Sequence, residues 1–167
     1  MKLTDISTIR QLFEKHGFSF TKSLGQNFLI NPTVCPKIAE MGGAGKNVGA
    51  IEIGTGIGVL TRELAERCEK VVAIEIDTGL KPILDETLEE YDNVEVIFAD
   101  VMETDLNKLI AEKFSGMDVI VCANLPYYIT SPVIMKLLEE KLPIKAITVM
   151  VQLEAADRIC AAVGSRE

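Results

Sequence analysis

Short apolar runs alternate with longer amphipathic segments from residue 50 of the chain onward. Short apolar runs predict buried strands, and apolar residues that recur every three or four positions predict helices. The predicted strands cover residues 50–53, 71–76, 94–98, 118–123 and 146–151. The predicted helices cover residues 58–68, 79–90, 105–114 and 132–140. This alternation is typical of an α/β fold, in which a parallel sheet has helices on both faces.

The order of the strands follows from the way in which parallel strands are connected. Crossovers between parallel strands are right-handed, and a switch point between the first and fourth strands places helices on both faces. We therefore expect the strand order 3-2-1-4-5. All strands of such a sheet end at the same edge, so the residues that follow them line one crevice.

The first part of the chain departs from this alternation. Residues 5–16 carry apolar side chains on one helical face, and we expect Thr4 or Asp5 to cap this helix and Gly17 to end it. The segment that follows has no clear period and predicts a loop. We expect Asn31 to cap a second helix that has a proline in its first turn.

We assign the whole chain, residues 1–167, to one domain with three parts. Residues 1–47 form an N-terminal extension of helix and loop, and residues 48–151 form the core of strands and helices. Residues 152–167 begin the region after the fifth strand, where residues 153–162 predict a helix. Because the fifth strand is only just covered, we expect the chain to be the front part of something larger.

Composition favours an ordinary globular domain. The chain has 167 residues, of which 48% are hydrophobic and 25% are charged, which is enough to bury a sizeable core. It contains no apolar run of the roughly 18 residues that a membrane span needs, and it begins with a polar helix instead of a signal peptide. We therefore expect a cytoplasmic protein without a membrane partner. Its net charge of −8 disfavours polyanions unless the basic residues are concentrated.

The cysteines and the single histidine do not suggest catalysis or a metal site. The four cysteines are widely spaced, form no C-x-x-C pair and lie mostly in or beside apolar segments, so we expect reduced packing residues: Cys35, Cys68, Cys122 and Cys160. His16 lies near the end of a predicted helix and is expected on the surface. A mechanism that needs a histidine base must therefore use another group.

The first strand ends in a glycine turn. The strand contains one acid, Glu52, and is followed by Gly54, Gly56 and Gly58 before a helix begins. Glycine allows positive φ and close approach of a ligand, and the start of a helix offers unpaired N–H groups. The turn therefore predicts a nucleotide-sized pocket. The dinucleotide fingerprint requires glycine where the chain has Val59, which weakens the interpretation that the nucleotide is NAD.

Polar residues follow the next three strands at the same edge. The second strand ends at Glu75 and Asp77, the third at Asp100 and the fourth at Asn124. A carboxylate after the second strand can accept hydrogen bonds from both ribose hydroxyls. Asp100 can accept a hydrogen bond from the amine of an adenine. For each residue taken alone a helix cap is the plainer reading, but the set of four favours a nucleotide site.

The stretch from Asn124 to Tyr128 is the most informative one. It reads Asn-Leu-Pro-Tyr-Tyr, and it offers the amide oxygen of Asn124, the carbonyl of Pro126 and the ring of Tyr127. Two acceptors beside an aromatic face suit the amine of a planar base. The plainer alternative is a loop before a helix that starts at Ser131 and Pro132.

Five motifs together make the chain resemble the ribosomal RNA adenine dimethylase family. They occur in the order and spacing of that family over nearly the whole chain: SLGQNFL at 23–29, IEIGTGIGVLT at 51–61, Glu75, FAD at 98–100 and ANLPYYITSP at 123–132. The resemblance implies a Rossmann-like class I S-adenosylmethionine-dependent methyltransferase. It also implies transfer of methyl groups to N6 of two adjacent adenosines of small-subunit rRNA, twice on each.

The resemblance assigns a role to each site residue. S-adenosyl-L-methionine would be closed over by Asn27 and Leu29. Its methionine part would lie on the turn of Gly54 and Gly56, its ribose on Glu75 and its adenine on Asp100. Asn124, which also borders the cofactor, would hold the target amine together with the carbonyl of Pro126, and Tyr127 would stack on the target base. The resemblance implies action on the pre-ribosomal small subunit without a metal ion, and we expect a monomer.

The chain departs from the family at several positions. Thr55 replaces the usual proline of the glycine turn, Leu153 and Ala155 replace a lysine and a valine, and residues 78–79 replace a more polar pair. We expect Thr55 to be tolerated, whereas the lost lysine lies on the side where RNA is expected. We also expect the family's last strands and its C-terminal helical domain to lie outside this stretch of sequence.

Three other functions stay open at this point. One is a resistance-type methylase that acts on large-subunit rRNA, although SLGQNFL and NLPYY are closer to the small-subunit branch. Another is a cofactor-binding module for ribosome assembly in which catalysis is secondary. The third is an NAD-dependent oxidoreductase, which Val59 and the lack of a group that could assist hydride transfer disfavour.

Overall fold

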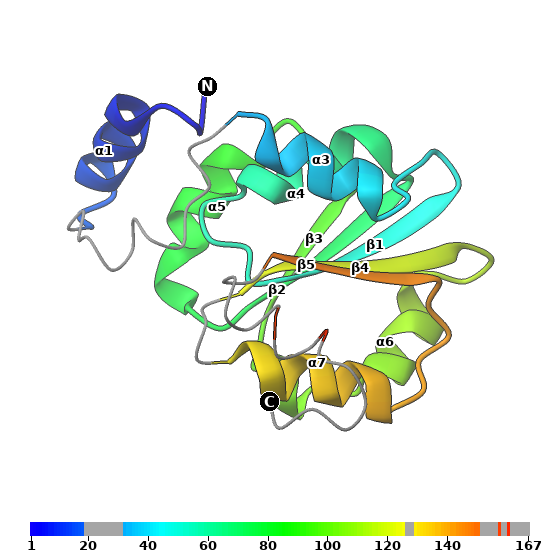
Figure 1. Ribbon diagram of the computed structural model, residues 1–167. Coiled ribbons are helices and arrows are strands. Elements are labelled where there is room, and N and C mark those ends of the chain that lie inside the picture. The colour runs from blue at the N-terminus through cyan, green and yellow to red at the C-terminus, as the bar shows by residue number, and fades with distance from the viewer. Residues whose placement is uncertain (19–31, 126–128, 151–156, 158–159, 161–167) are drawn as a thin grey trace.

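The described part of the chain forms a single five-stranded parallel sheet (Figure 1). The computed structural model describes residues 1–18, 32–125, 129–150, 157 and 160. The strand order is β3-β2-β1-β4-β5, so the predicted fold class and strand order are confirmed. The strands are β1 (Val48–Ile53), β2 (Lys70–Glu75), β3 (Val94–Phe98), β4 (Asp118–Asn124) and β5 (Ala146–Met150).

Helices cover both faces of this sheet (Figure 1). One face carries α3 (Val34–Met41), α4 (Val59–Arg67) and α5 (Lys81–Thr87), and the other carries α6 (Leu106–Lys113) and α7 (Thr130–Glu139). Two 3₁₀ turns, η1 (Thr78–Leu80) and η2 (Val101–Glu103), follow β2 and β3, and α1 (Ile6–Lys15) packs beside α5. The switch between β1 and β4 lies where the sequence predicted it.

Helix boundaries follow local capping chemistry. Asp5 caps α1 by accepting a hydrogen bond from the N–H of Ser7, and Gly17 follows the helix with φ +74°, as expected. Asn31 lies outside the described residues, and α3 begins only after Thr33, so the proline at position 32 precedes this helix. The region predicted as one helix over residues 79–90 is instead η1 followed by the shorter α5.

Two prolines explain further differences from the predicted helices. Pro82 lies in the first turn of α5, where its missing N–H costs nothing, and a separate helix therefore starts at Lys81. In the same way Pro132 lies inside the first turn of α7, which begins at Thr130. The predicted helix over residues 153–162 lies almost entirely outside the described residues.

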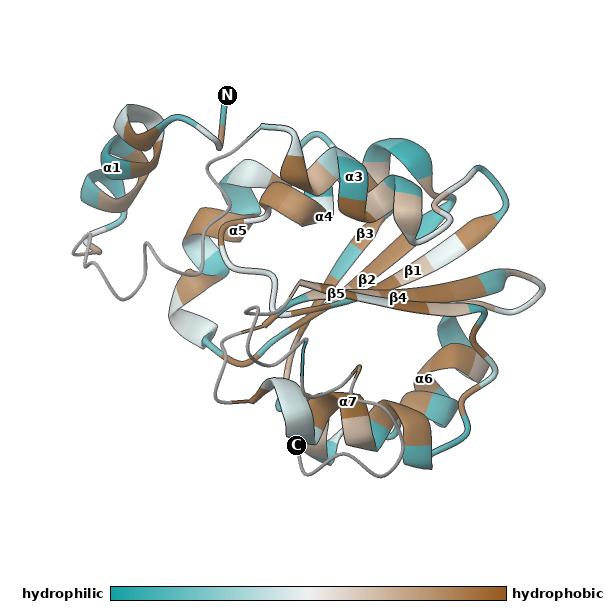
Figure 2. Ribbon diagram, viewed as in Figure 1, coloured by the Kyte–Doolittle hydropathy of each residue, from teal (hydrophilic) through white to brown (hydrophobic). Residues whose placement is uncertain are grey.

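The core lies on both faces of the sheet, as a parallel sheet requires. Alternate residues of β1, β2 and β4 point to opposite faces, and Figure 2 shows that these strands are apolar along much of their length. One face packs against α6 and α7, and the other against α3 and α4. No helix in the described part of the chain is long and apolar enough to cross a membrane.

Three of the four cysteines belong to this core. Cys35, Cys68 and Cys122 are buried free thiols, and burial raises the pKa of Cys35 and of Cys122 to about 12. Their predicted packing role is confirmed. The prediction is wrong for Cys160, which is exposed because it follows the last strand and lies outside the packed layers.

A buried acid connects the central strand to the helix that follows it. Glu52 of β1 is 1% exposed, and its carboxyl group accepts a hydrogen bond from the hydroxyl of Thr61, which is 0% exposed. Burial raises the pKa of Glu52 to about 8, the hydrogen bond from Thr61 lowers it, and the nearby charge of Glu75 raises it further. The pair therefore joins β1 to α4 directly below the glycine turn, with Glu52 holding a proton at neutral pH.

The raised pKa of Glu52 predicts that stability falls at alkaline pH. Because the folded-state pKa lies above the ordinary value of 4.5, the folded chain binds the proton more tightly. This contribution is complete below about pH 4.5 and is lost as pH rises through about 8. Glu52→Gln removes the charge, so the variant should gain roughly 3–5 kcal/mol over the wild type by pH 9. Urea unfolding from pH 5 to 9 measures this difference.

The exposed Glu89 provides the matched control for this experiment. Glu89→Gln should follow the wild-type curve at every pH, because this substitution on the surface leaves the buried pair of Glu52 and Thr61 in place. Parallel curves for Glu52→Gln and the wild type would contradict the assignment of a protonated Glu52.

Candidate functional site

The turn after β1 requires its three glycines. Gly54, Gly56 and Gly58 have φ values of 80°, 58° and 96°, in the left-handed region that side chains disfavour. The turn is also closely packed. A Cβ at Gly54 would lie 3.4 Å from the carbonyl oxygen of Asn124, and one at Gly58 would lie 3.0 Å from Oγ1 of Thr87. The glycines therefore allow both the backbone conformation and the contact with β4.

The carboxylate of Glu75 joins the turn after β1 to the turn after β2. Its Oε1 accepts a hydrogen bond of 2.9 Å from the N–H of Gly56, and its Oε2 accepts one of 2.9 Å from the N–H of Asp77. Each carboxylate oxygen has a further lone pair, so two hydroxyl groups can still donate to this side chain. Glu75 is 7% exposed and is thus held in one orientation by main-chain donors.

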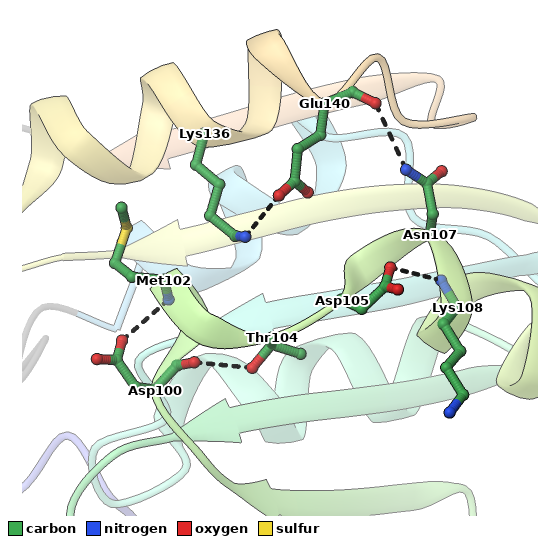
Figure 3. A network of polar contacts seen from close by, with 8 residues as sticks. All are labelled: Asp100, Met102, Thr104, Asp105, Asn107, Lys108, Lys136 and Glu140. Atoms are coloured by element: carbon green, nitrogen blue, oxygen red, sulfur yellow. Dashed lines mark hydrogen bonds and ion pairs between the residues drawn. The ribbon is translucent and has the colours of Figure 1, made fainter.

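Asp77 and Asp100 each cap a short 3₁₀ turn at the same edge. Oδ1 of Asp77 accepts the N–H of Gly79 at 2.9 Å, and Oδ1 of Asp100 accepts the N–H of Met102 at 2.9 Å. The hydroxyl of Thr104 donates to the carbonyl oxygen of Asp100 at 2.8 Å, which fixes this turn further (Figure 3). Both acids therefore have the capping role that was the plainer reading, and among the described residues no hydrogen bond occupies the second carboxylate oxygen of either acid.

The structure brings the predicted residues to one edge in the order of the strands. The N–H of Ala99, after β3, donates to the carbonyl oxygen of Glu75 at 3.0 Å, so Asp100 follows directly beside β2. Gly54 contacts the main chain of Asn124 on the other side. Asn124 is partly buried at the end of β4, in register with Met150 of β5. Acceptors on both sides thus flank the glycine turn.

Four of the predicted site residues lie outside the described part of the chain. They are Asn27, Leu29, Pro126 and Tyr127. The described remainder is Gly54, Gly56, Glu75, Asp100 and Asn124, and all five of these lie at the carboxyl edge of the sheet. Their roles stay predictions, whereas their common location is a property of the fold.

Two exposed apolar side chains at this edge were missed by the sequence analysis. Ile76 is 67% exposed directly after Glu75, and Met102 is 43% exposed two residues after Asp100. Large apolar side chains that lie beside acids at the edge of a sheet can pack against a flat base. The sequence signal for both was an apolar residue where the chain leaves the sheet. Ile76 lies between two acids, and Met102 lies two residues after one.

Thr55 takes its place inside the turn. It is 4% exposed, and its hydroxyl has no hydrogen-bond partner among the described residues. Its side chain is therefore directed into the protein, away from solvent. Within the described ranges no three histidine, cysteine, aspartate or glutamate side chains lie together in a way that could hold a metal ion.

Comparison with known proteins gives a consistent result. The family model described as ribosomal RNA adenine dimethylase matches residues 17–167. The chain is 52% identical over 167 residues to the ribosomal RNA small subunit methyltransferase A of Geobacillus sp. (strain WCH70). That match covers 98% of this chain and 57% of the relative, so the chain spans little more than half the length of this relative.

Solved structures show the same similarity in three dimensions. A dimethyladenosine transferase from Plasmodium falciparum matches with a TM-score of 0.66 and 34% identity, over 81% of this chain and 46% of that one. The 23S rRNA methyltransferase ErmE matches with a TM-score of 0.67 and 32% identity, over 78% of this chain and 50% of that one.

The fold and the family can now be stated together. The strand order, the glycine turn and the acid after β2 form the fold of the class I S-adenosylmethionine-dependent methyltransferases. The family model covers more than half of the chain, and the motifs at 51–61 and 123–125 lie where β1 and β4 meet. The chain belongs to the ribosomal RNA adenine dimethylase family.

Proposed function

We propose that this chain binds S-adenosyl-L-methionine and belongs to an enzyme that dimethylates N6 of two adjacent adenosines in small-subunit (16S) rRNA. The contact between Gly54 and Asn124 carries the proposal. A Cβ at Gly54 would lie only 3.4 Å from the carbonyl oxygen of Asn124. The turn that suits the methionine part of the cofactor therefore adjoins the residue that suits the target amine.

The described residues fit the cofactor. Glu75 offers one lone pair on each oxygen, in an orientation fixed by Gly56 and Asp77, which suits the two hydroxyls of a ribose. Asp100 offers its second carboxylate oxygen to the adenine amine, and Ile76 and Met102 offer exposed apolar surface for the ring. The three glycines leave room for the methionine part of the cofactor to approach the main chain.

Asn124 would hold the N6 amine of the target adenine, which is the nucleophile of the reaction. The lone pair of adenine N6 is delocalised into the ring, which makes the amine a weak nucleophile. The amide oxygen of Asn124 and the carbonyl oxygen of Pro126 would accept hydrogen bonds from the two N–H groups of this amine and favour its pyramidal form. The ring of Tyr127 would stack on the base. When bound, S-adenosylmethionine supplies a methyl group on a positively charged sulfur.

Methyl transfer would be an in-line displacement. A C–N bond forms as the C–S bond breaks, S-adenosylhomocysteine leaves, and the surplus proton of the alkylated amine passes to solvent. The residues of the site would hold the amine close to the methyl group and exclude water from the space between them. No metal ion is needed for this balance. Such an enzyme would act on the small ribosomal subunit in the cytoplasm, and we propose that it does so as a monomer.

One specific observation supports a second candidate. The similarity to a 23S rRNA methyltransferase, with a TM-score of 0.67, makes large-subunit rRNA the alternative substrate. The higher identity to a small subunit methyltransferase, 52% against 32%, favours the first assignment. Methyl transfer to large-subunit RNA alone would reverse this order.

Cofactor binding gives the first test. Calorimetric titration of this chain should detect S-adenosylmethionine and no NAD, and Glu75→Ala should weaken binding by about tenfold or more, because hydrogen bonds to a charged group are lost. Glu89→Ala, on the exposed end of the α5 region, should bind as the wild type does. Binding of NAD, or unchanged S-adenosylmethionine affinity in Glu75→Ala, would contradict the proposal.

The role of Asn124 has its own test. In the longer enzyme to which we propose that this chain belongs, Asn124→Ala should keep its affinity for S-adenosylmethionine within about threefold and lose at least about a hundredfold in methyl transfer, because two acceptors on the amine act together. Transfer of labelled methyl groups to unmethylated small subunits measures this loss. Asn107→Ala, which removes a hydrogen bond between α6 and the residue after α7, serves as the control (Figure 3). Retained transfer in Asn124→Ala would refute the amine-holding role.

A further inference from the structure

We infer that Phe18 is a positioning residue for the carboxylate of Glu75. Its ring packs against the 3₁₀ turn η1, and the residue that caps this turn supplies one of the two N–H groups that orient Glu75. This inference deepens the proposed function and rests on it for the nature of the ligand. It gives the N-terminal helix a part in ribose recognition.

The end of α1 holds Phe18 in place. The N–H of Phe18 donates to the carbonyl oxygen of Phe13 at 2.8 Å, and the two ring centroids lie 6.1 Å apart at an interplanar angle of 39°. Phe13 is 0% exposed and belongs to a cluster that contains Ile57 of the glycine turn and Leu80 of η1. Phe18 is therefore attached to the most deeply buried residue of the helix.

An ionic contact fixes the same end of α1 to α5. Glu86 of α5 accepts a hydrogen bond from Nζ of Lys15 at 2.8 Å, and its other oxygen lies 2.7 Å from Nε2 of His16. The hydrogen bond from Lys15, followed by that from His16, lowers the pKa of Glu86. Because α5 follows η1 directly, α1 and η1 are both tied to this helix.

The ring of Phe18 leaves no room at Gly79 of η1. A Cβ at Gly79 would lie 3.2 Å from Cζ of Phe18 and 3.0 Å from Oδ1 of Asp77. A side chain at position 79 would therefore have to displace the ring or the cap, so ring, turn and cap lie close together around this glycine.

This arrangement continues into the site. The N–H of Gly79 donates to Oδ1 of Asp77, and the N–H of Asp77 donates to Oε2 of Glu75, both at 2.9 Å. Gly56 holds the other oxygen of Glu75. A shift of η1 would therefore lengthen one of two hydrogen bonds and rotate the carboxylate about the other. Ribose hydroxyls would lose their aligned acceptors, while the rest of the ligand would keep its contacts.

Selectivity for ribose hydroxyls separates this role from a merely structural one. The affinities to compare are those for S-adenosylhomocysteine and for its 2′,3′-dideoxy analogue, which cannot donate to Glu75. The selectivity ratio is the affinity for S-adenosylhomocysteine divided by the affinity for the analogue. In Phe18→Ala this ratio should fall by about fivefold or more, while the affinity for the analogue stays within about twofold of the wild-type value. An equal loss for both ligands would overturn the inference, as would an unchanged ratio.

A double-mutant cycle tests the route through Gly79. Gly79→Ala should lower the selectivity ratio as Phe18→Ala does. In the double variant the added methyl group fills the space that the ring has left, so the ratio should be no lower than in Phe18→Ala. Additive losses would show that Gly79→Ala acts through Asp77 alone and would overturn the route. Gly45→Ala is the matched control, since its Cβ would meet only Cγ2 of Val48 at 3.8 Å.

A measurement on the free chain distinguishes failure of this inference from failure of the proposed function. Amide hydrogen exchange at Asp77 should be about fivefold faster in Phe18→Ala than in the wild type, because its hydrogen bond to Glu75 is loosened. Unchanged exchange would overturn the inference whatever the ligand is. Faster exchange in a chain that binds no S-adenosylhomocysteine would uphold the coupling and refute the proposed cofactor.

Discussion

The hydrogen bonds to Glu75 are the constraint on which the rest of the edge depends. A carboxylate that is 7% exposed has lost most of its water, and main-chain N–H groups from two turns replace it. Those N–H groups point inward only if the glycine turn keeps its left-handed conformation and η1 keeps its cap. The conformations of two separate loops are thus tied to one side chain.

Two glutamates on neighbouring strands have different surroundings and therefore different roles. Glu52 lies below the turn, where its carboxyl group accepts a hydrogen bond from the hydroxyl of Thr61, and burial raises its pKa to about 8. Glu75 lies at the strand end, where the N–H groups of Gly56 and Asp77 donate to its two carboxylate oxygens. The charge on Glu75 raises the pKa of Glu52 as well, so the charged acid helps to keep its neighbour neutral. One acid supports the turn and the other is available to a ligand.

The sequence predicted those features that depend on local pattern and on the geometry of parallel sheets. Apolar runs located all five strands, and their common edge brought Gly54, Glu75 and Asn124 together without knowledge of any side-chain contact. Contacts between distant parts of the chain were not predictable in this way. The packing of Phe18 on Gly79 joins residues far apart in sequence, and neither residue type indicates the other. The exposure of Ile76 likewise depends on where the chain leaves the sheet.

The strand order has a consequence for chain entropy. Val48 of β1 pairs with Asp118 of β4, about 70 residues further along the chain, and this pairing is what brings Asn124 beside Gly54. Closing a flexible loop of that length costs about 4 kcal/mol of conformational entropy beyond a length-independent term. Folding meets this cost once, through the apolar contacts of the sheet. A ligand that arrives later finds the two halves of the crevice already joined and contributes none of its own binding energy to bringing them together.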